Sequence, residues 1–305
     1  MSELEVRVRV PGKVNLALHV GGVDEQGYHE LGTVFQAVSV YDDVIARPAP
    51  RGVFTLALSG EGEDWLPTDS SNLAIRAARA LAEANDVDEG VELLIHKRIP
   101  VAGGMAGGSA DAAGTLLACS VLWDVAAEPE DLTGLAKALG ADVPFALLGG
   151  VAIGTGRGDD LVPVLTRGTL HWVFATSHDG LSTPRVFRRF DELSTPRPVT
   201  IDDDLLAALA IGDAAAVGRH LTNDLADAAI DLDPRLAGVL EAGRSAGAIG
   251  ATVSGSGPTC AFLVPDPDTG FTVAHALAAH PDVAATHRAS GPVPGAQVSY
   301  MPEIA

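Results

Sequence analysis

A glycine-rich segment between residues 100 and 114 places the strongest constraint on the fold of this chain. Four of the six residues from 103 to 108 are glycine. The segment follows the apolar run Val91–Ile95, which predicts a strand, and it opens a run that predicts a helix ending near Trp123. Glycine lets the backbone approach a ligand closely, and the N-terminus of a helix attracts anions. The sequence therefore predicts a phosphate-binding loop between a strand and a helix.

This loop differs from the two common nucleotide-binding loops. It lacks the Gly-Lys-Ser/Thr of the Walker A motif, and its glycines do not fit the G-x-G-x-x-G spacing. The alternative is a glycine-rich turn that only connects a strand to a helix. Four glycines within six positions are more than such a connection needs, so a binding function is favoured.

The charge and composition of the chain exclude several other classes of protein. The chain has 305 residues and a formal net charge of −20. This charge argues against a nucleic-acid surface, which offsets phosphate charge with Lys and Arg. The N-terminus has no signal-peptide core, and no apolar run has the length of a membrane span. The two cysteines, Cys119 and Cys260, are too few for a disulfide framework. We expect a cytoplasmic protein with no membrane partner.

Strand and helix patterns mix along the chain without a strict βαβ rhythm, which predicts an α+β fold. We expect strands at 6–10, 14–20, 53–58, 91–95, 170–175 and 259–264. We expect helices that begin near residues 72, 109 and 142, and helices at 132–139, 203–210, 213–221, 234–246 and 271–279. The first strand is expected to end at Pro11-Gly12, and Gly149–Gly158 is the best candidate for a domain junction. The tail from Ser290 is assigned no chemistry.

Six segments of the chain resemble motifs of one enzyme family. Val10–Leu16, Pro100–Ala113 and Thr252–Thr259 resemble the three general motifs of the galactokinase, homoserine, mevalonate and phosphomevalonate kinases, the GHMP family. Three more segments are similar to the family members that act on a cytidyl-diphosphate substrate, and these are Gly27–Leu31, Gly140–Phe145 and Leu181–Phe187. Together the six cover about residues 8 to 262 in the right order. The departures are small and lie at Met105, Ala106 and Ala110.

The resemblance implies a two-domain fold, with an ATP-binding domain at 1–158, a second domain at 159–305 and the active site in the cleft between them. It implies that ATP and Mg²⁺ are used to phosphorylate the 2-hydroxyl of a methylerythritol linked to cytidine diphosphate, in the non-mevalonate route to isoprenoid precursors. A homoserine or mevalonate kinase is the nearest alternative, followed by a related decarboxylase and by a nucleotide-binding regulator without turnover. The segment Gly27–Leu31 disfavours the first of these. The presence of both Lys13 and Asp142 disfavours the regulator, because a binding protein needs no base.

Asp142 is the candidate general base, since a carboxylate can take the proton of an attacking hydroxyl. Its position before Val143-Pro144 also suits a helix cap, and the two roles are compatible. The resemblance places Lys13 near this Asp and the reacting hydroxyl, where a cation favours the ionised carboxylate. A solvated lysine in a turn is the alternative. Asn15, two residues along the same expected strand, shares a face with Lys13 and is a candidate for hydrogen bonding to substrate.

The resemblance also implies the groups that hold the two nucleotides. Tyr28 and Phe187 are expected to sandwich the cytosine, His29 to hydrogen-bond its polar edge, and Thr183 to contact the same substrate. Asn72 and Lys97 are expected to line the adenine side of the ATP pocket, although helix capping and solvation account for them almost as well. Ser109 is expected to reach Mg²⁺ or a phosphate oxygen. The residues of the expected ATP-binding loop are Pro100, Val101, Ala102, Gly103, Gly104, Met105, Ala106, Gly107, Gly108, Ser109 and Ala110.

Overall fold

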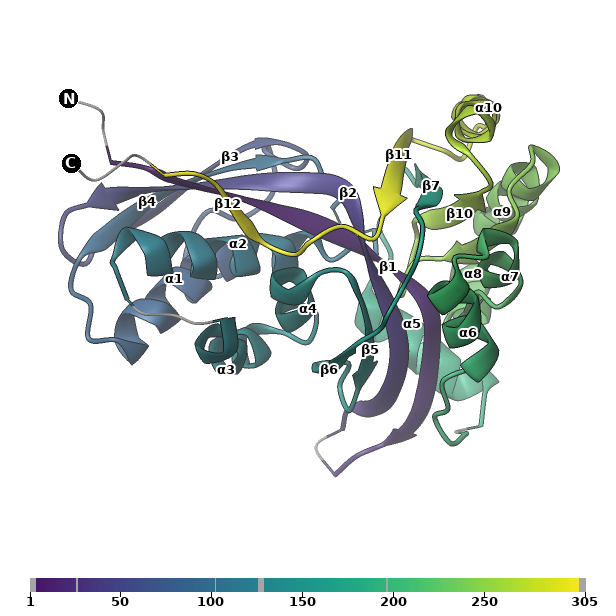
Figure 1. The fold of residues 1–305 in the computed structure, drawn as a ribbon, viewed down its shortest axis with the longest axis horizontal. Helices are drawn as coiled ribbons and strands as arrows, with labels where there is room; N and C mark the ends of the chain where they lie inside the picture. Colours follow the sequence, from purple (N-terminus) through teal and green to yellow (C-terminus); the bar gives the residue numbers. More distant parts are fainter. Residues whose placement is uncertain (1–3, 26, 102, 126–128, 196, 302–305) are drawn as a thin grey trace.

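Two β-sheets and ten helices form the molecule in a computed structural model, which describes residues 4–25, 27–101, 103–125, 129–195 and 197–301. Figure 1 shows the larger sheet with its helices on the left and the smaller sheet with its helices on the right. This mixture of helices and separate, mainly antiparallel sheets confirms the α+β prediction. Among these residues, no helix is both long and apolar enough to cross a membrane.

The larger sheet has the strand order β12-β1-β2-β4-β3; in addition β5 pairs with β2, β6 with β5, and β8 with β1. Its strands are β1 (Val6–Val23), β2 (His29–Ala49), β3 (Phe54–Gly60), β4 (Gly90–Lys97), β5 (Val151–Thr155), β6 (Asp160–Pro163), β8 (Thr222–Asn223) and β12 (Gln297–Tyr300). The helices that accompany it are α1 (Leu73–Ala84), α2 (Gly107–Leu122), α3 (Pro129–Leu139) and α4 (Val143–Leu148). The helix α2 packs on β1 and β2, so it is the central helix of this half.

The smaller sheet has the strand order β11-β7-β10-β9 and is antiparallel throughout. Its strands are β7 (Leu170–Thr176), β9 (Gly250–Val253), β10 (Cys260–Val264) and β11 (Ala285–Gly291). The helices of this half are α5 (Thr183–Leu193), α6 (Asp203–Ile211), α7 (Ala214–Arg219), α8 (Ala226–Leu232), α9 (Arg235–Ser245) and α10 (Pro267–Ala278). Phe262 and Trp172, both fully buried, belong to this sheet and help to fill the interior.

The local signals for helices are largely confirmed, because they depend on neighbouring residues. Asn72 caps α1, where its side chain accepts a hydrogen bond from the Ala74 N–H. Ala77 and Leu81 share the buried face of that helix, as the spacing predicts. The helix α2 is rich in Ala and Gly and is buried on nearly every side, which lets it lie close to the sheet.

In the first half one prediction was wrong and one long strand was not predicted. Pro11-Gly12 does not end a strand, since β1 continues through it with only a shift of register against β2. The strand β2 was missed altogether, because most of its residues are buried on both faces and do not alternate. The expected junction, Gly149–Gly158, contains β5, which pairs with β2. The division into domains at residue 158 stays a prediction.

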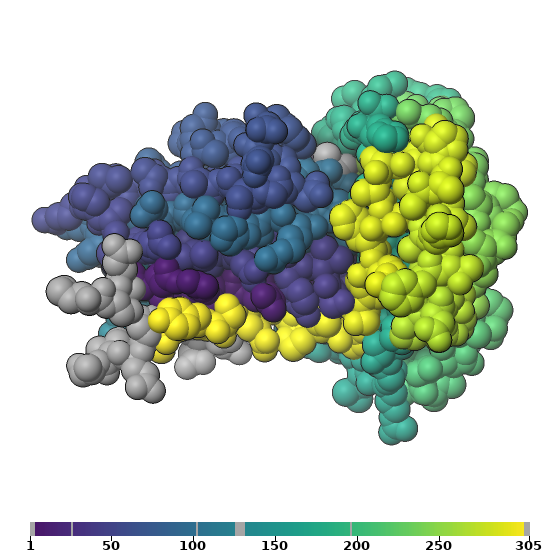
Figure 2. Space-filling model, turned by 90° about the horizontal axis from the view of Figure 1, so that it is seen from above, coloured from purple at the N-terminus to yellow at the C-terminus, as the bar shows by residue number. Residues whose placement is uncertain are grey.

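The end of the chain returns to its beginning. After β11 the chain leaves the smaller sheet, and β12 then pairs with β1 in antiparallel register, with Val298 opposite Val8. Figure 2 shows this segment in yellow along the purple N-terminal strand. The tail from Ser290 therefore joins the two halves of the molecule.

Candidate active site

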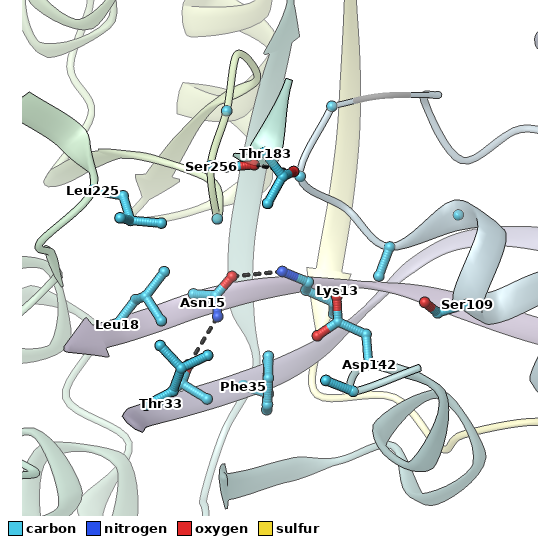
Figure 3. Close-up of a pocket in the computed structure, with 18 of the residues that line it drawn as sticks. Lys13, Asn15, Leu18, Thr33, Phe35, Ser109, Asp142, Thr183, Leu225 and Ser256 are labelled. Atoms are coloured by element: carbon cyan, nitrogen blue, oxygen red, sulfur yellow. Dashed lines mark hydrogen bonds between the residues drawn. The ribbon is translucent and has the colours of Figure 1, made fainter. Parts of the chain in front are cut away.

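A cavity of ≈ 490 Å³ lies where the glycine loop, β1, the start of α4 and the turn between β9 and β10 meet. Segments that are far apart in the sequence form its wall, and Figure 3 shows how their side chains face it. The polar or charged side chains in the lining are Lys13, Asn15, Thr33, Ser109, Asp142, Arg157, Thr183 and Ser256. The cavity thus contains both residues that the sequence nominated for catalysis.

The glycine loop borders this cavity, as the sequence predicts. The helix α2 begins at Gly107, directly after Ala106, which adopts a left-handed conformation with φ of 59°. Six described loop residues line the cavity besides Pro100, and they are Gly103, Gly104, Ala106, Gly107, Gly108 and Ser109. Met105 is fully buried, Val101 and Ala110 are not part of the lining, and Ala102 lies outside the described residues. The N–H groups at the start of α2 therefore lie beside the cavity.

At two positions of the loop the structure shows why glycine is required, which the sequence did not reveal. A Cβ atom on Gly104 would clash with the backbone oxygen of Ser254, and one on Gly103 would clash with the Thr259 hydroxyl. The Ser254 hydroxyl also donates a hydrogen bond of 3.1 Å to the Gly104 carbonyl oxygen. These glycines let the loop meet the turn between β9 and β10, whereas a Cβ on Gly108 would make only an ordinary contact, 3.7 Å from a Leu73 methyl group.

The turn between β9 and β10 lies against the Lys13 side chain. Gly255 has φ of 55°, and a Cβ on it would lie 3.3 Å from the Lys13 Nζ atom. The Asn223 amide holds this turn by donating hydrogen bonds of 2.7 Å to the Val253 carbonyl and 2.8 Å to the Gly255 carbonyl. Sequence reasoning missed Asn223, because β8 brings it here from about thirty residues away and no motif marks it.

Lys13 is buried on β1, and its backbone N–H donates to the Met105 carbonyl of the glycine loop at 3.2 Å. Its ammonium group donates a 2.6 Å hydrogen bond to the Asn15 side-chain oxygen. Burial lowers the pKa of Lys13, while the negative charge of Asp142 opposes that shift. Lys13 is therefore a buried cation rather than a solvated turn lysine.

A short hydrogen-bonded chain fixes the orientation of Asn15. Its side-chain NH₂ group donates to the Thr33 hydroxyl at 2.8 Å, and this hydroxyl donates to the Ala17 carbonyl at 2.7 Å. The Asn15 side-chain oxygen is thereby turned toward Lys13, as Figure 3 shows. Thr33 is a further residue of this group that the sequence did not nominate, since it lies on the strand β2.

Asp142 stands immediately before the first residue of α4, with φ of −85° and ψ of −10°. Its side chain accepts no hydrogen bond from the helix, so capping does not account for this carboxylate. In Figure 3 the carboxylate lies beside the Lys13 side chain and faces the cavity. Local sequence placed Asp142 at a helix start, and the fold brings it next to a buried ammonium.

Only some of the residues expected to hold cytosine line the main cavity. The His29 ring stacks on the Phe187 ring, with centroids 5.3 Å apart and an interplanar angle of 28°. Phe187 and Thr183 line the main cavity, whereas His29 borders an adjacent cavity of ≈ 440 Å³ and Tyr28 lines neither. The His29 Nδ1 atom is 3.0 Å from the Gly21 carbonyl oxygen, and its Nε2 atom is 3.2 Å from an Asp191 carboxylate oxygen.

Asn72 and Lys97 do not line the main cavity. Lys97 is buried on β4, where its ammonium lies 2.8 Å from an Asp42 carboxylate oxygen and 2.6 Å from one of Asp111. Burial raises the pKa of the Asp111 carboxyl to about 7, although Lys97 opposes the shift. The predicted contacts of Asn72 and Lys97 with ATP stay predictions.

Comparison with known proteins identifies the family of this chain. The model of the GHMP kinases N terminal domain matches residues 72–150, and the model of the GHMP kinases C terminal domain matches residues 205–283. A 4-diphosphocytidyl-2-C-methyl-D-erythritol kinase of Cutibacterium acnes is 52% identical over 301 residues, which are 97% of each chain. The enzyme of that name from Thermobifida fusca is 54% identical over 96% of this chain and 98% of its own.

Solved structures give the same result. A crystal structure of 4-(cytidine 5'-diphospho)-2C-methyl-D-erythritol kinase is 35% identical with a TM-score of 0.76, over 93% of this chain and 98% of that one. A homoserine kinase from Cytophaga hutchinsonii has a TM-score of 0.77 at 19% identity over 98% of both chains, and this likeness concerns the fold alone. The chain belongs to the GHMP kinase family, among the 4-diphosphocytidyl-2-C-methyl-D-erythritol kinases.

Proposed function

We propose that this chain transfers the γ-phosphate of ATP to the 2-hydroxyl of 4-diphosphocytidyl-2-C-methyl-D-erythritol, in the non-mevalonate route to isoprenoid precursors. The names of the relatives, at about half identity over nearly the whole chain, support this substrate. The observation that carries the chemistry is that Asp142 and the buried Lys13 ammonium both line the cavity and that the charge of Asp142 acts on Lys13. A base and a cation beside each other suit the transfer of a phosphoryl group to a hydroxyl.

In the proposed reaction the Asp142 carboxylate accepts the proton of the 2-hydroxyl as that oxygen bonds to the γ-phosphorus. The bond from the γ-phosphorus to its bridging oxygen breaks, and ADP leaves. The Lys13 ammonium offsets charge on the phosphoryl oxygens during the transfer. Asn15 keeps the Lys13 side chain pointed at this place through its 2.6 Å hydrogen bond.

The phosphates of ATP are assigned to the glycine loop, where the N–H groups at the start of α2 can receive anionic oxygens. Mg²⁺ fits this place because it usually takes only one or two protein ligands and fills the rest with phosphate oxygens and water. The Ser109 hydroxyl lines the cavity beside this loop, and this oxygen donor would hold the ion. When bound, Mg²⁺ neutralises charge on the phosphates. In the described part of the chain, no group of three His, Cys, Asp or Glu forms a dedicated metal cage.

The cytidine end of the substrate is assigned to Phe187, His29, Tyr28 and Thr183. Phe187 offers an aromatic face to the main cavity. For the His29 Nε2 atom to reach the base, it must exchange its contact with Asp191, which is half-exposed, for a contact with cytosine. The Thr183 hydroxyl lies 2.8 Å from the Ser256 hydroxyl, so the two close the wall on this side. The active site then spans a cleft between domains at 1–158 and 159–305.

The experiment is ADP formation from ATP and Mg²⁺ with each of three acceptors: the cytidyl-diphospho-methylerythritol, homoserine and mevalonate. We expect turnover with the cytidyl substrate and only background rates with the other two. Equal or faster turnover of homoserine or mevalonate would overturn the proposed substrate. Release of carbon dioxide from a mevalonate derivative would instead indicate the decarboxylase.

A further inference from the structure

The turn between β5 and β6 brings one unassigned cation to the mouth of the main cavity. This turn is Gly156–Asp159, and Arg157 is at its tip. Gly156 and Gly158 have φ of 66° and 91°, conformations that side chains rarely adopt, so both flanking positions favour glycine. The Gly156 carbonyl accepts a 2.7 Å hydrogen bond from the Leu31 N–H, which ties the turn to β2. The position of Arg157 is therefore set by a tight, anchored turn.

The Arg157 side chain lies between two parts of the expected cytidyl site. Its guanidinium carbon is 4.1 Å from the centre of the Tyr28 ring. Arg157 lines the main cavity and also the adjacent cavity that His29 borders. In the part of the chain that the structure describes, no ion pair or hydrogen bond occupies the guanidinium group, and nearby Asp160 is paired with Lys137. All five N–H donors of Arg157 are thus free to bind a ligand.

The charges that line the cavity indicate which ligand the free Arg157 donors could bind. The whole chain carries −20, and both expected substrates are anions. Among the described residues, the main cavity has only three charged side chains in its lining, and these are Lys13, Asp142 and Arg157. Lys13 already faces Asp142 at the reacting end. A diphosphate that passes between the cytidine and the reacting hydroxyl therefore has Arg157 as its available cation.

We propose that Arg157 binds the diphosphate of the cytidyl substrate, a residue role that rests on the proposed function. Arginine suits this task because its planar fork pairs with two phosphate oxygens at once and stays charged. Stacking on the Tyr28 ring already restricts the Arg157 guanidinium group. The side chain therefore loses less conformational entropy when it binds a ligand. The cytosine then lies with Phe187 and His29, the diphosphate under Arg157, and the methylerythritol at Lys13 and Asp142.

The test compares Arg157→Gln and Arg157→Lys with the control Arg79→Gln. Arg79 lies 5.0 Å from the centre of the Phe54 ring and outside the cavity lining, so its loss removes the same charge and the same kind of stacking elsewhere. Steady-state kinetics with each substrate varied in turn gives separate KM values. We expect Arg157→Gln to raise KM for the cytidyl substrate about 10- to 100-fold, the usual worth of a hydrogen bond to a charged group, and to leave KM for ATP within about twofold. Arg157→Lys should fall between, because it keeps the charge and loses the fork.

Calorimetric titration with cytidine and with cytidine diphosphate, at saturating ADP, identifies the group that Arg157 contacts. We expect Arg157→Gln to weaken cytidine diphosphate about 10-fold or more and to leave cytidine unchanged. Equal weakening of both ligands would mean that Arg157 acts only through Tyr28 and would overturn the proposal, as would a selective rise of KM for ATP. If wild-type protein does not turn over the cytidyl substrate, the proposed function fails instead, and the ratio of the two affinities still reports on Arg157.

Discussion

Two buried lysines lie on the larger sheet, and their surroundings are opposite in kind. Lys97 on β4 has two carboxylates within hydrogen-bonding distance, Asp42 at 2.8 Å and Asp111 at 2.6 Å. Lys13 on β1 has a neutral hydrogen-bond partner, the Asn15 side-chain oxygen at 2.6 Å. Its interaction with Asp142 is electrostatic. The pKa of Lys97 is raised because its two carboxylates outweigh burial, whereas burial lowers the pKa of Lys13.

The difference indicates what each lysine is for. An ammonium has three N–H donors, and Lys97 directs two of them to carboxylates that lie on β2 and α2. Asp42 in turn accepts hydrogen bonds from the Arg98 and Ile99 N–H groups, just before the glycine loop. Lys97 therefore holds the base of the loop in place, and its donors are mostly used within the protein. Lys13 directs one donor to Asn15 and has donors left for a ligand.

The largest effect on stability is expected for Lys97→Met. This change leaves two buried carboxylates without their cation, and breaking a buried pair in this way costs about 3–5 kcal/mol of unfolding free energy. The measurement is denaturant unfolding followed by circular dichroism. Lys137→Met is the control, since its pair with Asp160 is at the surface, where such pairs contribute about 0–1 kcal/mol. If Lys97→Met lowers the unfolding free energy by less than about 1 kcal/mol, the ion pairs of Lys97 contribute no more than surface pairs do. That result would contradict the structural role assigned to Lys97.

The next effect is expected for Lys13→Met, and it concerns activity rather than stability. Removing a preorganised charge from a phosphoryl-transfer site lowers kcat by about 10²- to 10³-fold, by analogy with the loss of one oxyanion donor. The unfolding free energy should stay equal or rise, because an incompletely compensated buried charge is removed. Rapid-quench kinetics and denaturant unfolding on one preparation check both. Destabilisation without loss of kcat would give Lys13 the role assigned here to Lys97.

A smaller effect is expected in the pH dependence of stability. The pKa of Lys13 in the folded protein is below that of the unfolded chain, so the unfolded chain binds more protons between the two values. Wild-type stability therefore gains from Lys13 as the pH rises through the folded pKa toward about 10.5. The stability advantage of Lys13→Met over wild type should be full below the folded pKa of Lys13 and should become smaller as the pH rises from that value toward about 10.5. An advantage that grows with pH would contradict the lowered pKa.

The helices near the site could be predicted from sequence, whereas the reasons for the site's shape could not. Asn72 and Asp142 mark helix starts through residues next to them, so local patterns suffice. The clash that keeps Gly104 a glycine comes from Ser254, about 150 residues away, and no local pattern contains it. The partners of Lys97 lie on other elements in the same way, which is why a solvated or ATP-contacting lysine was the prediction. Motif resemblance nominated Lys13 and Asp142, which the fold brings to one cavity, because a family motif includes such distant constraints.

The role of Asp142 as general base is the central claim, and one measurement tests it most directly. This is the single-turnover rate of phosphoryl transfer to the cytidyl substrate in Asp142→Asn, with ATP affinity and the unfolding midpoint measured on the same sample. Asp213→Asn is the control, because Asp213 caps α7 through its side chain and lies outside the cavity lining. We predict a rate about 10²- to 10⁴-fold below wild type, with ATP affinity and unfolding unchanged. A rate within about threefold of wild type, in a folded protein that binds ATP, would contradict the assignment.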